Sequence, residues 1–388
     1  MTLTFKRRGD MSAHSPVNPS SAARWLQCPG SVRLAAQYPD DDSEPAREGT
    51  AAHHALALLT AEQPCDVGMV APNGVILTAE MIEAAEVAYD AARIRLGRAT
   101  ALGDAGAVCE RTIPIKRVHE QCYGTPDLRA WLPRFVLYVQ DFKFGHGYVD
   151  AFENWQLICY VAGLLEEPHV KEWNLSDEAV TVVMEVVQPR SYSAEGPVRE
   201  WVVNASDLRT HINRLSMAAH EALGDNPTLR AGPECRYCPA RHACPVLQRE
   251  GYRIADAVPL VPPVELPPEA LGVELRYLTD AQRLLDARVE GLSEQVKSLA
   301  RQGSRVPGWM LKQEPGREVW TVPAAEVITA GTMLGVDLAK PPEALTPNQA
   351  RAAGVPADVV AAFATRPAGA LKLKPDDGTD ARRVFSKS

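Results

Sequence analysis

The chain has no run of apolar residues that approaches the roughly 18 required for a membrane-spanning helix, so a helical membrane protein is not expected. Apolar residues are also missing after the basic start, MTLTFKRRGD, which disfavours a secretory signal and predicts a cytoplasmic protein. Basic residues do not outnumber acidic ones: 41 Lys and Arg stand against 49 Asp and Glu, a net charge of −8. This balance disfavours a protein that coats nucleic acid with a broad basic surface, yet it allows a local basic groove around a metal site.

What the chain does contain is an alternation of helical and strand patterns. Apolar spacing near 3.6 residues predicts a helix that begins near Gly49 and further helices at 79–98, 151–165, 206–223 and 268–302. Stretches rich in β-branched residues predict strands at 105–115, 123–132, 134–145, 178–189 and 198–205. The turn at Pro133–Arg134 predicts antiparallel pairing of the second and third strands. The expected fold class is α/β, a mixed sheet flanked by helices, with a mostly helical C-terminal region.

Proline marks a domain boundary in AVPLVPPVELPPEA, residues 257–270, which reads as a stiff linker rather than a folded segment. We therefore predict a first domain over residues 1–256 and a C-terminal accessory region over residues 271–388. The accessory region is expected to hold one long helix, a short hairpin at 308–321 and a polar tail.

Two aspartates and a lysine interrupt the strand pattern between residues 124 and 145. Alternate residues of a strand share a face, so Asp141 and Lys143 lie together, and Asp127 on the neighbouring strand reaches the same place. Two buried carboxylates repel unless a cation lies between them, and Mg²⁺ or Mn²⁺ suits such oxygen ligands. With a lysine that orients or deprotonates a water, the array suits phosphodiester hydrolysis. The open alternative is an Asp–Lys pair on a solvated sheet face.

The order and spacing of four motifs resemble the RecB-type branch of the PD-(D/E)xK nucleases. These motifs are Gly49-Thr50-x-x-His53, Gly124-Thr125-x-Asp127, Asp141-x-Lys143 and Gln156-x-x-x-Tyr160. The resemblance implies a restriction-endonuclease-like core and a metal-dependent DNA nuclease. It implies Mg²⁺ or Mn²⁺ ligands at His53, Asp127, Asp141 and the Phe142 carbonyl, catalytic roles for Asp127, Asp141 and Lys143, and DNA contacts from Gln156 and Tyr160. Position 141 is Asp where that family often has Glu.

Eight cysteines in a chain of this kind argue for metal ligands or buried thiols rather than a disulfide framework. Cys235-x₂-Cys238-x₅-Cys244 is a compact set that lacks a fourth ligand. His242, inside the loop, would complete a Cys₃His zinc site. Cys28, more than 200 residues upstream, would complete a Cys₄ site suited to iron–sulfur.

The chain is similar here to iron–sulfur members of the same nuclease branch, in which one cysteine precedes the histidine motif and three follow the last nuclease motif. That resemblance implies a [4Fe–4S] cluster on Cys28, Cys235, Cys238 and Cys244, with Zn²⁺ as the alternative. The remaining cysteines show no spacing typical of ligands.

Nearly the whole chain also resembles an uncharacterised family of phage and prophage proteins. The two resemblances together imply an exonuclease of phage DNA recombination or processing, acting on DNA in the bacterial host cytoplasm beside an annealing or single-strand-binding protein. Two other functions stay open: a non-catalytic DNA-binding or scaffolding protein that kept the fold, and a zinc-bearing interaction module.

Overall fold

The computed structural model describes residues 15–38, 44–101, 105–191, 196–255 and 266–311, with 326, 328–329, 333, 359, 362–364 and 382–383. The chain divides into two compact units, residues 1–294 with 374–388 and residues 295–373. Most of the predicted linker and hairpin lies outside the described residues. In the part of the chain that is described, no helix combines the length and the apolar character needed to cross a membrane.

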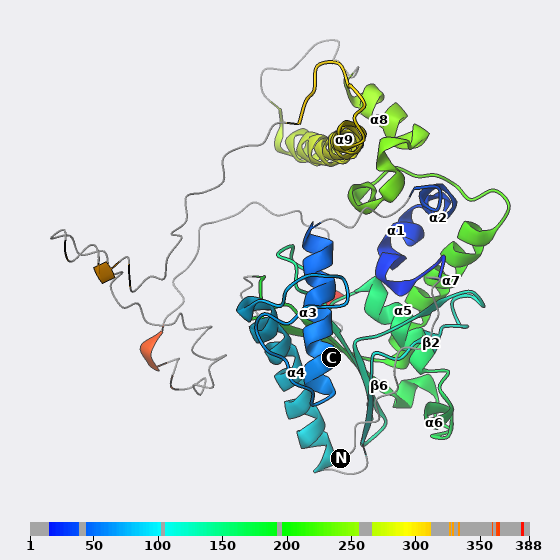
Figure 1. Ribbon diagram of the computed structural model, residues 1–388. Coiled ribbons are helices and arrows are strands. Elements are labelled where there is room, and N and C mark those ends of the chain that lie inside the picture. The colour runs from blue at the N-terminus through cyan, green and yellow to red at the C-terminus, as the bar shows by residue number, and fades with distance from the viewer. Residues whose placement is uncertain are drawn as a thin grey trace. The chain divides into compact units, whose positions relative to one another are not determined.

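A mixed five-stranded sheet, in the order β1-β4-β5-β6-β7, forms the centre of the first unit (Figure 1). Its strands are β1 (Gly106–Cys109), β4 (Leu128–Leu132), β5 (Val136–Phe142), β6 (Thr181–Val187) and β7 (Val198–Asn204). All neighbouring strands pair antiparallel except β5 and β6, which run parallel. Parallel neighbours need a crossover connection, and helix α5 (Trp155–Leu164) lies in that connection. A separate two-stranded ribbon pairs β2 (Ile113–Pro114) with β3 (Tyr123–Gly124).

Helices cover both faces of the sheet (Figure 1). On one face, α1 (Ala22–Gln27), α5 and α7 (Arg209–Leu223) share a buried core with Leu137 and Val139 of β5. On the other, α3 (Glu44–Thr60) and α4 (Ala79–Thr100) pack on sheet residues that include Phe142 and Tyr138. Because side chains alternate along a strand, Asp141 lies on the α5 face while Phe142 lies on the α3 face. Residues 232–245, which hold Cys235, Cys238 and Cys244, are called the cysteine segment, and helix α8 (Pro245–Ala255) follows them. The other helices before residue 256 are short: η1 (Pro19–Ser21), α2 (Gly30–Ala35), α6 (Pro168–Lys171), η2 (Asp177–Ala179), η3 (Ala205–Leu208), η4 (Pro233–Tyr237) and η5 (Pro239–His242).

Within the described residues, the predicted helices and sheet strands are confirmed, while several boundaries are wrong. The first long helix begins at Glu44, five residues before the predicted start at Gly49. The helix predicted over 151–165 begins only at Trp155, because Asn154 caps it. The expected strand 105–115 is split into β1 and β2, and Asp127 lies just before β4 rather than within it. The antiparallel pairing across the Pro133–Arg134 turn is confirmed.

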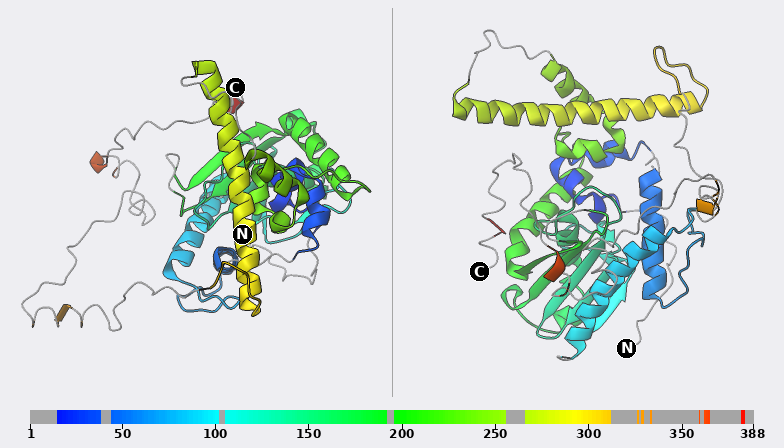
Figure 2. Two further views of the ribbon diagram at one scale, coloured as in Figure 1. Left: turned by 90° about the horizontal axis from the view of Figure 1, so that it is seen from above. Right: turned by 90° about the vertical axis from the view of Figure 1, so that its left-hand side faces the viewer.

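The long helix predicted at 268–302 is α9 (Pro268–Arg301), which Figure 2 shows as one continuous helix. Its middle packs on the cysteine segment: Ala287 and Leu284 join a small core with Cys235 and Leu247. The contact is close, since a Cβ on Gly291 would lie 2.6 Å from Cγ of Arg241. The helix belongs to the first unit as far as Glu294.

Candidate functional site

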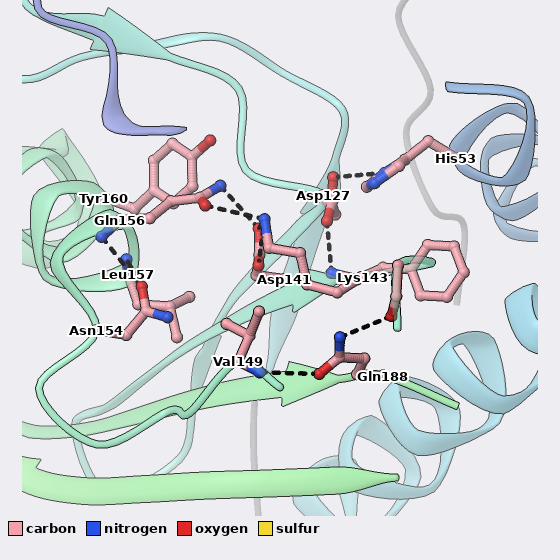
Figure 3. Close-up of polar contacts among 12 residues, drawn as sticks. His53, Asp127, Asp141, Lys143, Val149, Asn154, Gln156, Leu157, Tyr160 and Gln188 are labelled. Carbon is pink, nitrogen blue, oxygen red and sulfur yellow. Dashed lines mark hydrogen bonds and ion pairs between the residues drawn. The ribbon is translucent and has the colours of Figure 1, made fainter. Parts of the chain in front are cut away.

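His53 and Asp127 form the first half of the site. Helix α3 carries His53 to the end of the sheet, where its Nδ1 lies 3.1 Å from Oδ1 of Asp127. The other Asp127 oxygen, Oδ2, accepts a hydrogen bond of 2.7 Å from the backbone N–H of Phe142 (Figure 3). That bond ties the segment before β4 to the end of β5. Asp127 therefore contacts the backbone of β5 at the residue next to Asp141.

Asp141, Lys143 and Gln156 form the second half. Lys143 Nζ lies 2.9 Å from Oδ2 and 3.2 Å from Oδ1 of Asp141, and it donates to Oε1 of Gln156 at 2.9 Å. The amide nitrogen of Gln156 donates to Oδ1 of Asp141 at 2.8 Å. Figure 3 shows this closed triangle of side chains, two from the end of β5 and one from the first turn of α5. A solvated Asp–Lys pair is excluded, because Asp141 is 2% exposed.

The two carboxylates differ electrostatically. Burial raises the pKa of Asp141, and Lys143 offsets only part of that effect. Burial would also raise the pKa of Asp127, but the His53 ring beside it brings the pKa below its usual range. The Asp127 charge in turn is one of the causes that raise the pKa of Asp141, so the two carboxylates are electrostatic neighbours. The arrangement is that of adjoining buried acids, a setting in which a bound cation relieves repulsion.

The basic partners are correspondingly held in their charged forms. Burial alone would lower the pKa of His53, but the Asp127 carboxylate raises it to about 9. Burial likewise opposes the charge on Lys143, yet Asp141 outweighs it and raises the pKa above 10.5. Lys143 is therefore an ammonium donor at neutral pH rather than a base.

Tyr160, one turn after Gln156 on α5, is buried, and its hydroxyl donates to the Thr125 carbonyl at 3.1 Å. Gly124 lets the chain pass close by, since a Cβ there would lie 2.7 Å from Pro19 and 3.0 Å from the Tyr160 ring. Tyr160 thus supports the backbone that leads into Asp127.

Glu110 is a site residue that the sequence analysis missed. It follows β1 directly, and one ligand atom each from His53, Glu110 and Asp127 all lie within 4.8 Å of one another. Its backbone adopts a φ of 47°, which is unfavourable for a residue with a side chain, and its N–H donates to the Asp127 carbonyl at 3.2 Å. The signal available in the sequence was an acidic residue at the end of a strand that pairs beside Asp127.

These residues fit a hard divalent cation. Glu110 and Asp127 supply carboxylate oxygens and His53 a ring nitrogen, a donor set that Mn²⁺ and Mg²⁺ accept. Asp141 does not belong to the group formed by His53, Glu110 and Asp127. Its buried Oδ2 lies 2.9 Å from Lys143 Nζ, but no donor is placed to give it a hydrogen bond of good geometry. A buried carboxylate oxygen with spare acceptor capacity is what a metal ligand requires.

Gln188, at the end of β6, fixes the loop between Lys143 and α5. Its amide nitrogen donates to the carbonyls of Gly145 and Gly147 at 2.8 and 2.6 Å. Its amide oxygen accepts from the Val149 N–H at 3.0 Å (Figure 3). The same oxygen accepts from Arg199 at 2.6 Å. One buried side chain therefore sets the path of the loop that joins the two parts of the Asp141–Lys143–Gln156 triangle.

The four predicted cluster cysteines come together around one pocket, although Cys28 is more than 200 residues from the others in sequence. The pocket is lined by Cys28, Cys235, Cys238 and Cys244 and encloses about 340 Å³, its open mouth included. Burial raises the pKa of Cys28 and raises that of Cys235 to about 11, so a metal would have to displace protons from these thiols.

The spacing of the four sulfurs can be compared with the needs of a zinc ion and of a [4Fe–4S] cluster. Four thiolates around one zinc ion, with Zn–S near 2.3 Å, lie only about 3.8 Å apart. Among the described residues no three of these sulfurs lie within 4.8 Å of one another. In a [4Fe–4S] cluster each thiolate binds a different iron, so wider spacing is expected. His242 does not line the pocket, and its ring packs instead on Tyr38, with centroids 4.6 Å apart.

The chain belongs to the family described as protein of unknown function (DUF2800), whose model matches residues 14–338. The match spans the His53 helix, the sheet with its acids, the cysteine pocket and the whole of α9.

Proposed function

We propose that the chain is a divalent-metal-dependent deoxyribonuclease that hydrolyses phosphodiester bonds, specifically an exonuclease of phage DNA recombination or processing. The observation that carries this proposal is the convergence of His53, Asp127, Asp141 and Lys143 at one end of the sheet. They come from α3, the segment before β4, and the end of β5. The mixed sheet with helices on both faces supports the restriction-endonuclease-like core that the motifs imply.

The residues have distinct tasks in this mechanism. His53, Glu110, Asp127 and Asp141, with the Phe142 carbonyl, would hold Mg²⁺ or Mn²⁺, which when bound polarises a phosphate and lowers the pKa of water. Lys143, as an ammonium, donates to the attacking water or to the phosphate oxygens and stabilises the negative charge that develops there.

Gln156 and Tyr160 are assigned positioning tasks. Gln156 donates to Asp141 and accepts from Lys143, which fixes the distance between the carboxylate and the ammonium. Because Gln156 is only partly buried, it also has surface left for a DNA strand. Tyr160 holds the Thr125 carbonyl, so we assign it to the placement of Asp127 rather than to a first contact with DNA.

We further propose that Cys28, Cys235, Cys238 and Cys244 hold a [4Fe–4S] cluster. The wide spacing of their sulfurs and the exclusion of His242 from the pocket support it over zinc. The cluster site is separate from the nuclease residues, so its task is structural.

The nuclease proposal is tested with protein purified without oxygen and assayed on end-labelled linear and on circular DNA with Mg²⁺ or Mn²⁺. We expect degradation of linear DNA alone, lowered by at least about 100-fold in Lys143→Ala and Asp141→Asn. Lys171→Ala is the matched control, because Lys171 forms an exposed ion pair with Glu166 and should leave the rate unchanged.

Each other outcome has a meaning. Cleavage of circular DNA would replace the exonuclease by an endonuclease. DNA binding without cleavage under either metal would indicate the non-catalytic binding protein. Wild-type rates in Lys143→Ala would overturn the proposed site.

A further inference from the structure

Helix α9 carries leucine at every seventh position over four heptads. These leucines are Leu271, Leu278, Leu285, Leu292 and Leu299. The residues four positions after the first four leucines form a second row, Leu275, Gln282, Val289 and Val296, which is apolar except for Gln282. Alternating steps of four and three residues over this length are the pattern of a coiled coil, in which both rows lie on one seam of the helix. We call this seam the leucine seam.

Most of the leucine seam is exposed, while Leu285, which lies near Gly251 of α8, and Val296 are half-buried. Leu271, Leu278 and Val289 keep 56%, 54% and 61% of their surface exposed. Leu275 and Leu292 are also exposed. Isolated leucines on a surface are ordinary, but a row of them on one side of a 34-residue helix is not.

A different face of α9 already packs on the cysteine segment. Ala281, Ala287 and Gly291 are the buried residues of the helix, and Arg288 donates to the His242 carbonyl. On a helical projection at 100° per residue, Ala287 and Gly291 lie roughly 130–180° around the axis from the leucine seam, whereas Ala281 and Arg288 flank the seam at roughly 80°. The helix therefore has two apolar faces, of which one is covered within the chain.

The seam fits a second copy of the same helix. Leucine in one row with β-branched residues in the other, as at Val289 and Val296, favours two parallel strands. Gln282 is the single polar residue of the seam, and in a parallel pair it would meet its own copy, amide to amide. A lone polar residue at such a position fixes register and strand number.

Charge and length agree with this occupant. In a parallel pair, Arg288 would flank Ser293 of the other copy and Glu274 would flank Thr279, so like charges do not oppose one another. The seam is about 42 Å long at 1.5 Å per residue. Two strips of that length and one helix width amount to roughly 800 Å² before side-chain corrugation is counted, and the relief of the side chains must add to this area to reach the roughly 1,200 Å² of stable interfaces.

We propose that the chain forms a two-fold dimer through a parallel, in-register coiled coil of the α9 leucine seam. The inference stands on the seam alone and does not depend on the nuclease proposal. The partner it names is a second copy of this chain.

The test is sedimentation equilibrium of the full-length protein between about 1 and 50 µM. We expect a mass of twice 42.2 kDa for the wild type. Leu278→Glu with Leu292→Glu should weaken association by at least 100-fold and give the monomer mass. The matched control is Val273→Glu with Tyr277→Glu, two exposed apolar residues of α9 outside the seam, which should leave the dimer intact. Circular dichroism and thermal unfolding check that each variant is folded.

Orientation is tested separately with Gln282→Cys and a short bismaleimide. A parallel, in-register pair should give a covalent dimer, which Tyr277→Cys and the wild type should not give. A monomeric wild type, a dimer that survives both glutamates, or a dimer lost equally in the control would overturn the proposal. A covalent dimer that forms only with the 277 cysteine would overturn the parallel register.

Discussion

In the His53–Asp127 pair, the proton on the His53 ring affects both the ion pair and the binding of a metal. The charged pair raises the pKa of His53 from 6.5 to about 9, so in metal-free protein the ring is protonated at neutral pH. A metal can bind only the neutral ring, and its binding therefore displaces that proton. Affinity for Mn²⁺ should accordingly increase as the pH is raised from 6.5 towards 9.

We predict a pH-dependent cost for His53→Gln in protein kept in a chelator. Because the folded pKa lies above the unfolded one, the stabilisation is complete below about pH 6.5 and is lost as the pH passes through about 9. The ring is one-third exposed, so solvent screening limits the expected loss to about 1 kcal/mol at pH 6. Urea unfolding at pH 6 and at pH 9.5 measures it, and the two proteins should converge at the higher pH. An equal difference at both values would contradict the ion pair.

At the scale of the element, the start of α5 fixes the Asp141–Lys143–Gln156 triangle. Asn154 accepts hydrogen bonds from the N–H groups of Gln156 and Leu157 at 3.0 and 3.2 Å, and its own amide donates to the Asp150 carbonyl at 2.8 Å. The helix therefore begins at Trp155, one residue before Gln156, which joins Asp141 to Lys143. A shift of this turn would move Gln156 with it.

We predict that Asn154→Ala lowers the free energy of unfolding by about 1 kcal/mol, the usual value of a lost N-cap. It should also lower the proposed nuclease rate, because Gln156 loses its fixed place. Asn154→Ser keeps a cap acceptor and is the control that should retain most of both properties. Stability and rate are measured on the same preparations. If the alanine variant lost stability but kept its full rate, Gln156 would not depend on the cap.

The helices and strands could be predicted from the sequence because the spacing of apolar residues differs between them and shows which face is buried. Element ends depend on individual contacts. The helix of His53 begins at Glu44 although Pro45 and Gly49 suggest a later start, and α5 starts at its Asn154 cap. The motif residues His53, Asp127, Asp141 and Lys143 were predicted as one group, and the structure brings them together. Glu110 was not predicted as a member of this group. Its position depends on its positive φ and on the pairing of β1 with β4, and the spacing of residues in the sequence shows neither.

At the scale of the whole molecule, the cysteine pocket joins the two ends of the sheet domain. Cys28 lies after α1, and the other three cysteines follow α7. Without any metal the two ends already touch: the Gly30 N–H donates to the Thr228 carbonyl at 2.9 Å, and the Arg230 N–H donates to the Cys28 sulfur at 3.2 Å. Together with the buried core that α1 and α7 share, these bonds connect the two ends of a loop of more than 200 residues, and a bound cluster would add a further link at the same place.

We predict that Cys28→Ser removes iron from anaerobically purified protein and destabilises the entire sheet domain. Closing a loop of this length corresponds to on the order of 4 kcal/mol, or roughly 10 °C in unfolding temperature for a domain of this size. Iron and sulfide analysis and thermal unfolding, followed by circular dichroism of the sheet, measure both effects. Cys65→Ser is the control, because Cys65 lies outside the pocket and should change neither. A variant that loses iron yet unfolds at the wild-type temperature would show that the cluster does not close the domain. Zinc without iron in the wild type would refute the [4Fe–4S] assignment. In that case, the unfolding temperature of Cys28→Ser would still show whether the bound metal stabilises the domain.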